Sequence, residues 1–149
     1  MNVILALDVG EERIGVALGR PDLALALPKC VLARQGRDRD IQALKTIALE
    51  EEACLWVVGL PRQADDRLSL MAKKILAFAA RLGRASCLPV AFVDEWETTR
   101  EATEFLLAAD LSRKRRRRAV DKLAAALIME RYFRSGPLAE DLWASNAGV

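Results

Sequence analysis

VILALDVGEERIGVALG, residues 3–19, is the most informative stretch of this chain. Residues 3–9 are apolar except for Asp8, and a run of this length is typical of a buried central strand because it is too short for a helix. Gly10 permits a turn, and residues 14–19 return as a second short apolar strand. The two runs therefore predict a β-hairpin with Asp8 near its mouth.

Asp8 is the one residue of this hairpin that needs a partner. An unpartnered carboxylate in a buried strand is energetically costly, so Asp8 must be paired, protonated, bound to a cation or placed at the open end of the strand. A divalent metal could use an aspartate there, and so could the phosphates of a nucleotide held through a metal. The alternative is a structural role, in which Asp8 caps the turn or pairs with Arg13.

The pattern Asp8-x-Gly10 with a further glycine occurs in two classes of protein. RNase H-like nucleases share it with the actin and sugar-kinase class of ATPases. Those ATPases close two domains over the nucleotide, whereas 149 residues make one ordinary domain. Length therefore favours the nuclease interpretation over a small ATPase.

The composition is that of a soluble globular domain, with 52% hydrophobic and 30% charged residues. No apolar run approaches the roughly 18 residues of a membrane span, and no basic residue precedes the first apolar stretch as it would in a secretory signal. The three cysteines, Cys30, Cys54 and Cys87, are odd in number and never in C-x-x-C spacing. They indicate neither a disulfide framework nor a zinc site, and a reducing cytoplasm is the expected compartment.

The chain contains no histidine, which excludes every catalytic or metal site that depends on an imidazole. Ser-His-Asp and Cys-His nucleophile systems need histidine, and so do histidine general bases and the usual nitrogen ligands of zinc, copper or iron. Carboxylate chemistry remains. Because carboxylates and water bind hard cations, Mg²⁺ or Mn²⁺ is the expected metal if the chain is an enzyme.

Positive charge is concentrated in one run, which holds six of the 23 basic residues. The rest of the chain has more acidic than basic residues. A local patch of this kind favours contact with a nucleic acid, although a charge run can also be only a solvated face. The run consists of Arg113, Lys114, Arg115, Arg116, Arg117 and Arg118.

The remaining apolar patterns predict an alternation of strands and helices. Residues 21–28 are expected to be a loop, Asp65 or Asp66 to cap a helix, and Gly83 to end that helix. The order predicts an α/β fold with a mixed five-stranded sheet, an antiparallel three-strand meander plus two parallel strands, flanked by helices. One domain is expected over residues 1–135, with a poorly ordered tail at 136–149. Further strands are predicted at residues 30–34, 54–59 and 88–94, and helices at residues 41–53, 67–82, 98–109 and 119–133.

Acidic residues occur at the first strand, at the end of the last strand and on the final helix. Asp94 is the last residue of the predicted strand at 88–94, Glu95 follows it directly, and Asp121 lies near the beginning of the last helix. Such a set is what two-metal phosphodiester cleavage needs, with cations roughly 4 Å apart. Taken singly, Asp94 could cap the next helix and Asp121 could favour its own helix N-terminus electrostatically.

Four segments resemble, in order and spacing, the motifs of the YqgF/RuvX family of Holliday-junction resolvases, which are relatives of RuvC. The likeness spans residues 3–133 and implies an RNase H-like fold. It also implies that Asp8, Glu95 and Asp121 are metal-binding catalytic acids, with Asp94 adjacent and supporting and Arg13 holding the hairpin or a phosphate. The four segments are LALDVGEERIGVALG, VVGLP, VDEWETTREATEFL and RKRRRRAVDKLAAALIM.

The chain departs from this family at one motif. The family usually reads D-E-R-x-T-T, whereas here Trp96 replaces the arginine and Glu97 follows it. The arginine contact to phosphate expected at that point is therefore absent. Trp96 could stack on an unpaired base, or it could pack in the core or at a subunit contact.

Two hypotheses from different classes follow. The first is a Mg²⁺- or Mn²⁺-dependent, structure-selective endonuclease. The resemblance implies branched DNA and Holliday-junction resolution as its main role, and processing of precursor 16S ribosomal RNA as the alternative. Because a four-way junction has two-fold symmetry, resolution would predict a homodimer. The second hypothesis is a non-catalytic module that binds nucleic acid and keeps the fold without the metal site.

Overall fold

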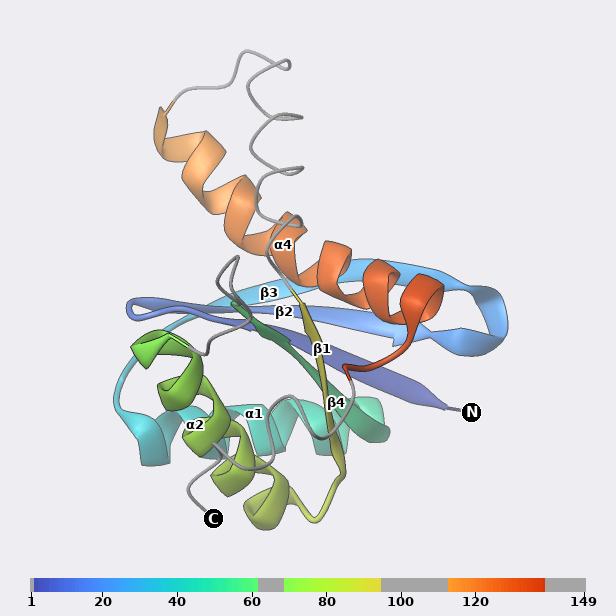
Figure 1. Ribbon diagram of the computed structural model, residues 1–149, viewed down its shortest axis with the longest axis horizontal. Helices are drawn as coiled ribbons and strands as arrows, with labels where there is room; N and C mark the ends of the chain where they lie inside the picture. Colours follow the sequence, from blue (N-terminus) through green and yellow to red (C-terminus); the bar gives the residue numbers. More distant parts are fainter. Residues whose placement is uncertain (1, 62–68, 95–112, 139–149) are drawn as a thin grey trace.

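The computed structural model describes residues 2–61, 69–94 and 113–138, and for residues 113–122 it describes the backbone alone. These residues form five strands, three α-helices and one short 3-10 helix (Figure 1). The elements are β1 (Val3–Val9), β2 (Arg13–Arg20), η1 (Pro21–Leu23), β3 (Leu25–Ala33), α1 (Arg37–Glu51), β4 (Ala53–Leu60), α2 (Leu70–Ser86), β5 (Val90–Asp94) and α4 (Arg113–Ser135).

The five strands form one mixed sheet in the order β3-β2-β1-β4-β5. β1 pairs antiparallel with β2, and β2 with β3, which confirms the predicted meander. β4 then pairs parallel with β1, and β5 pairs parallel with β4. The predicted mixed five-stranded architecture is therefore confirmed, and β1 lies at its centre.

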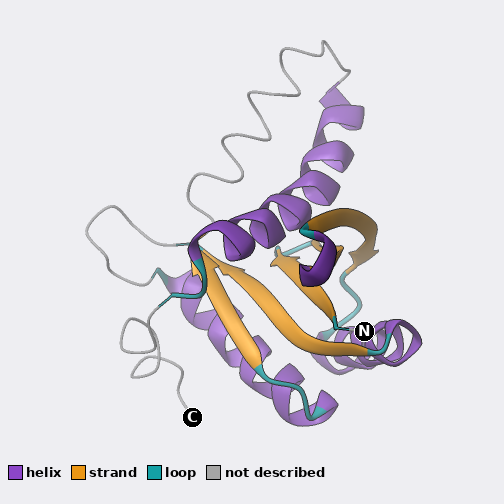
Figure 2. Ribbon diagram, turned by 90° about the vertical axis from the view of Figure 1, so that its right-hand side faces the viewer, coloured by secondary structure: helices purple, strands orange, loops and turns teal. Residues whose placement is uncertain are grey.

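The helices cover both faces of the sheet (Figures 1 and 2). α1 and α2 pack on one face, where Leu7 and Val58 of the sheet share an apolar cluster with helix residues such as Leu44 and Leu82. α4 packs on the other face, where Ala6 and Met129 belong to a second apolar cluster. β1 and β4 are thus buried on both sides, which explains why their sequences are continuous apolar runs rather than alternating ones.

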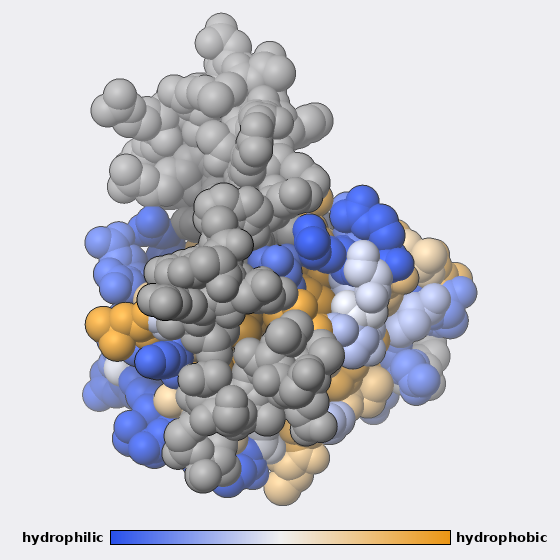
Figure 3. Space-filling model, viewed as in Figure 1, coloured by the Kyte–Doolittle hydropathy of each residue, from blue (hydrophilic) through white to orange (hydrophobic). Residues whose placement is uncertain are grey.

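Charged and polar residues form much of the outer rim of the face seen in Figure 3, with apolar surface showing between them. Large exposed apolar side chains in the described part include Leu23, Leu49 and Leu70. None of the described helices is both long and apolar enough to cross a membrane.

The third strand is longer than its sequence pattern indicates. β3 begins at Leu25, so the expected loop at 21–28 is wrong for its second half. Pro28 lies inside this strand, which is possible because β3 is at the edge of the sheet and needs no N–H for an outer neighbour. The pairing shifts beside it, from Val16–Cys30 to Ala17–Pro28. Lys29, between the two paired residues of β3, is therefore the extra residue of a β-bulge.

The boundaries of α2 also differ from the prediction. Ser69 is the N-cap, and its hydroxyl accepts a hydrogen bond from the N–H of Ala72 at 3.1 Å. The expectation of a cap at Asp65 or Asp66 is therefore wrong, and both residues lie outside the described ranges. The helix continues through Gly83 to Ser86, so Gly83 does not end it. At Gly83 the helix packs closely against Val90, since a Cβ at this position would lie 3.1 Å from Cγ2 of Val90.

α4 begins six residues before the predicted start at residue 119. The basic run, which lies between the predicted helices at 98–109 and 119–133, therefore forms the first turns of α4, as expected for arginine and lysine, which are good helix formers. These turns project beyond the sheet, whereas the C-terminal half of α4 lies across it (Figure 1). The predicted helix at 98–109 lies outside the described residues.

The end of α4 leads back to the sheet. The N–H of Leu138 donates to the carbonyl oxygen of Phe92 at 2.7 Å, on the outer side of β5. The residues beyond 138 lie outside the described part, so the division into a domain at 1–135 and a tail at 136–149 stays a prediction.

A buried hydrogen bond connects β4 to α2 and generates a stability prediction. Nε1 of the fully buried Trp56 donates to Oγ of Ser86 at 2.8 Å, and that hydroxyl donates to the carbonyl of Leu82 at 2.7 Å. Ser86→Ala is expected to lower the free energy of unfolding by about 1–3 kcal/mol, because the indole N–H loses its acceptor. Urea denaturation measures this, and Trp56→Phe is the control background. An equal cost of Ser86→Ala in that background would contradict the prediction.

Candidate functional site

The carboxyl ends of β1, β4 and β5 lie at one edge of the sheet, because these strands run parallel. Asp8 is the penultimate residue of β1, and Asp94 is the last residue of β5. Leu7 pairs with Val58, and Val58 pairs with Phe92. Asp8 therefore lies one residue beyond that level of the sheet and Asp94 two residues beyond it. This edge is where open α/β sheets keep their ligand sites.

The pleat assigns the two carboxylates to different faces. Ile4 and Ala6 belong to the α4 cluster, so alternation places Asp8 on the α4 side as well. Phe92 belongs to the opposite cluster, which places Asp94 on the side of α1 and α2. The sheet edge thus brings Asp8 and Asp94 to the same end of the fold but not to the same face.

Glycines flank Asp8 within the sheet. Gly15 of β2 is its pairing partner, and Gly59 of β4 follows Val58 at the adjoining position. Because neither residue has a side chain, neither glycine places a side chain directly beside the half-buried Asp8. A glycine inside a strand often marks such a close approach by another group. An oxygen ligand in this setting fits a hard divalent cation.

The turn after Asp8 is tightly hydrogen-bonded. The N–H of Gly10 donates to the carbonyl of Arg13 at 2.8 Å, and the N–H of Arg34 donates to the carbonyl of Glu12 at 2.9 Å. A Cβ at Gly10 would lie 2.9 Å from the carbonyl oxygen of Arg13, so only glycine fits there without a shift of the backbone. Arg13 pairs with Glu12, with Nη1 3.3 Å from Oε2.

Arg34 fastens this turn to the rest of the domain. Its Nη1 donates to the carbonyl of Gly10 at 2.9 Å, and its Nε donates to Oδ2 of Asp40 at 2.7 Å. Asp40 is 4% exposed, and its Oδ1 accepts from the N–H of Gln35 at 2.9 Å. Asp40 also lies near the N-terminus of α1, where the helix dipole favours a negative charge. The chain from Asp40 through Arg34 to Gly10 therefore fixes the backbone two residues beyond Asp8.

Several predicted site residues are not placed by the structure. Glu95 and Trp96 lie outside the described ranges, and Asp121 lies within α4 where only the backbone is described. Among the described side chains, no group of three His, Cys, Asp or Glu residues forms a candidate metal cluster. The predicted association of Asp8, Glu95 and Asp121 thus stays a prediction. The basic run, Arg113 to Arg118, lies on the first turns of α4.

Comparison with known proteins relates this arrangement to a family. The profile of the RuvX family, described as "Holliday junction resolvase", matches residues 2–135. The chain belongs to the RuvX family. A relative from Desulforudis audaxviator named "Putative pre-16S rRNA nuclease" is 38% identical over 132 residues, which are 89% of this chain and 94% of that protein. A relative of the same name from Clostridium kluyveri is 39% identical over 130 residues, covering 87% and 95% of the two chains.

Solved structures agree with the RuvX assignment at the level of the fold. Thermus thermophilus RuvC in complex with a Holliday junction substrate gives a TM-score of 0.59 at 15% identity, covering 93% of this chain and 100% of that chain. A second Thermus thermophilus RuvC structure gives a TM-score of 0.53 at 16% identity, covering 91% and 99%. The predicted RNase H-like fold is thereby confirmed. As a RuvX-family member, the chain is a nuclease.

Arg34 and Asp40 are site-supporting residues that the sequence did not indicate. Arg34 was the expected end of a strand and Asp40 part of a polar connection, in a segment rich in charges. One available signal is that Asp40 directly precedes Ile41, the first apolar residue of a helix, where a carboxylate can reach back to backbone N–H groups.

The buried carboxylate of this connection yields a prediction. Asp40→Ala is expected to lower the free energy of unfolding by about 2–4 kcal/mol, because it leaves the guanidinium of Arg34 without its carboxylate. Asp38→Ala is the matched control, since Asp38 is on the same helix, is 88% exposed and pairs with Arg37 at 3.2 Å. Such an exposed pair contributes about 0–1 kcal/mol. Equal losses for both variants in urea denaturation would contradict the assignment of Arg34 and Asp40.

Proposed function

We propose that this RuvX-family nuclease is a divalent-metal-dependent endonuclease that processes a precursor of 16S ribosomal RNA. The observation that carries the metal site is Asp8, held at the carboxyl edge of the sheet between the side-chain-free positions Gly15 and Gly59. The substrate is proposed from the relatives named for pre-16S rRNA, which match this chain over nearly their whole length. Such a substrate would place the protein in the cytoplasm.

We assign the metal ligands to Asp8, Glu95 and Asp121, with Asp94 in a supporting role. The sequence spacing supports Asp121, which precedes Ala125 by four residues and Ile128 by seven, the spacing at which helical residues share one face. Ala125 and Ile128 belong to the cluster on the α4 side of the sheet, the side of Asp8. With no histidine in the chain, the donor set is made of carboxylates, which suit Mg²⁺ or Mn²⁺. Bound there, the cations would activate the attacking water and stabilise the leaving oxygen.

The other proposed roles belong to residues that hold the nucleic acid. The basic run Arg113 to Arg118 would contact phosphates from the projecting turns of α4. Arg13, on the hairpin that carries Asp8, would hold the turn or a phosphate. Trp96 would stack on an unpaired base or pack against protein.

A second candidate function is resolution of Holliday junctions, in DNA recombination and repair. The description of the family and the shared fold with RuvC favour it. This function would require a homodimer, because two symmetric strands must be cut. A four-way DNA junction, plain duplex DNA and a structured ribosomal RNA precursor, tested side by side with Mg²⁺ or Mn²⁺, separate the two candidates. Cleavage confined to the junction would overturn the RNA proposal.

Removal of the Asp8 carboxylate tests the metal site. Asp8→Asn is expected to reduce cleavage by at least about 100-fold, because a neutral amide cannot replace the charged oxygen ligand. Binding of the same nucleic acid should be retained. Asp22→Asn is the matched control, since Asp22 is exposed, pairs with Arg20 at 2.7 Å and lies beyond the other end of β2. Unchanged cleavage by Asp8→Asn, or an equal loss in both variants, would contradict the assignment.

The basic run is tested by the salt dependence of binding. Replacing Arg115 to Arg118 with alanine is expected to weaken binding to all sequences and to reduce the slope of log K against log[salt] by about 0.9 per lost phosphate contact on duplex DNA, or about 0.7 on a single strand. Replacing the same four residues with lysine is the control, because it keeps the charge. A slope that alanine leaves unchanged would mean that the run is a solvated face.

A further inference from the structure

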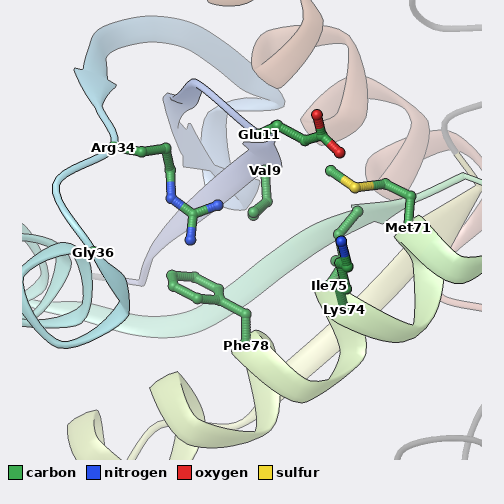
Figure 4. Close-up of a pocket in the computed structure, with 8 residues that line it drawn as sticks. All are labelled: Val9, Glu11, Arg34, Gly36, Met71, Lys74, Ile75 and Phe78. Carbon is green, nitrogen blue, oxygen red and sulfur yellow. The ribbon is translucent and has the colours of Figure 1, made fainter.

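A cavity of about 440 Å³ opens on the face of the sheet opposite to Asp8, a volume in the range of small-molecule sites. Three parts of the chain converge there: the end of the β1–β2 hairpin, the segment after β3, and α2 (Figure 4). None of its lining residues is one of the proposed metal ligands or belongs to the basic run. The cavity is lined by Val9, Glu11, Arg34, Gly36, Met71, Lys74, Ile75 and Phe78.

The polar groups of this cavity include hydrogen-bond donors that the described structure leaves unused. Arg34 donates from Nε to Asp40 and from Nη1 to the carbonyl of Gly10, and its Nη2 has no partner among the described residues. Arg34 cannot swing away, because both of these bonds and the ring of Phe78, 5.1 Å from the guanidinium carbon, hold it. Lys74 has no ion pair within the described part of the chain. Together they offer a fixed and a flexible cationic donor to an anion.

The remaining lining combines an apolar floor with one acceptor. Val9, Ile75 and Phe78 belong to the apolar core on this face and line the cavity, so a base that enters it would lie against apolar side chains. Glu11, on the hairpin, contributes a carboxylate that accepts hydrogen bonds (Figure 4). A nucleotide meets all three requirements, since it has a phosphate, a flat base and, in adenine, cytosine and guanine, an exocyclic amino group.

We propose that this cavity binds one nucleotide, with its phosphate on Arg34 and Lys74, its base on the apolar floor and the amino group of the base on Glu11. The nucleotide could be free in solution or one unit of a nucleic-acid strand, and the chemistry of recognition is the same in both cases. Because Arg34 also holds the carbonyl of Gly10, the occupant would contact the residues that fix the turn after Asp8. This site is separate from the proposed cleavage reaction. Its test is therefore nucleotide binding measured in the absence of metal.

The test for a free nucleotide is calorimetric titration of the full chain with AMP, UMP and inorganic phosphate. AMP is expected to bind with a Kd below about 1 mM, and Lys74→Glu to weaken it by at least about tenfold. Lys73→Glu is the matched control, since Lys73 is the neighbouring exposed lysine on α2 and does not line the cavity. UMP, which lacks the amino group, should bind more weakly than AMP, and Glu11→Gln should reduce that difference. Binding of inorganic phosphate as tightly as AMP would overturn the assignment of a nucleotide.

The test for a nucleotide within a strand is binding of a short single-stranded RNA of mixed sequence in EDTA. If AMP does not bind, a loss of RNA affinity of at least about tenfold in Lys74→Glu, with Lys73→Glu within about twofold of the parent, assigns the cavity to a strand. If neither AMP nor RNA binding distinguishes Lys74→Glu from Lys73→Glu, the proposal is wrong. Loss of cleavage in Asp8→Asn would be unaffected by that result, so the two proposals fail independently.

Discussion

The burial of β1 on both faces and along both edges is the constraint on which the structure depends. β2 and β4 pair with its edges, and the α4 cluster and the α1–α2 cluster cover its faces. A carboxylate in the middle of such a strand would lack both water and room for a counter-charge. Asp8 is tolerated because it lies one residue from the end, next to two glycines. The position that lowers the energetic cost of burying this aspartate also leaves its carboxylate accessible to a cation.

Hydrogen bonds from Arg34 hold the hairpin turn at the carboxyl end of β1 in place. Arg34 reaches from the end of β3 to the carbonyl of Gly10, and Asp40 at the start of α1 holds Arg34 in turn. A buried ion pair of this kind contributes orientation more reliably than net stability. One guanidinium thus connects three elements that are separate in the sequence, and it faces a cavity on one side of the sheet while fixing the approach to a carboxylate on the other.

The sequence predicts the architecture well because the strands that matter are buried on both sides and appear as short apolar runs. It fails where packing or pairing overrides local preference. Proline and glycine usually interrupt strands and helices, yet the edge strand accepts Pro28, and α2 continues through Gly83, where a Cβ would crowd Val90. The role of Arg34 and Asp40 is not visible in the sequence, because the bond from Arg34 to the carbonyl of Gly10 joins residues that only the folded hairpin brings together. The assignment of Asp8, Glu95 and Asp121 as catalytic acids stays a proposal from resemblance and spacing, since strand alternation and the helical period fix faces but not distances.

Both edge strands of the sheet carry features that hinder pairing with a strand of another molecule. The proline and the bulge interrupt the outer hydrogen-bonding row of β3, and Leu138 occupies a carbonyl on the outer side of β5. Both features disfavour the addition of a further strand, which is the common route from a folded sheet to aggregates. A chain with so apolar a central strand is thereby protected from forming continuous sheets between molecules.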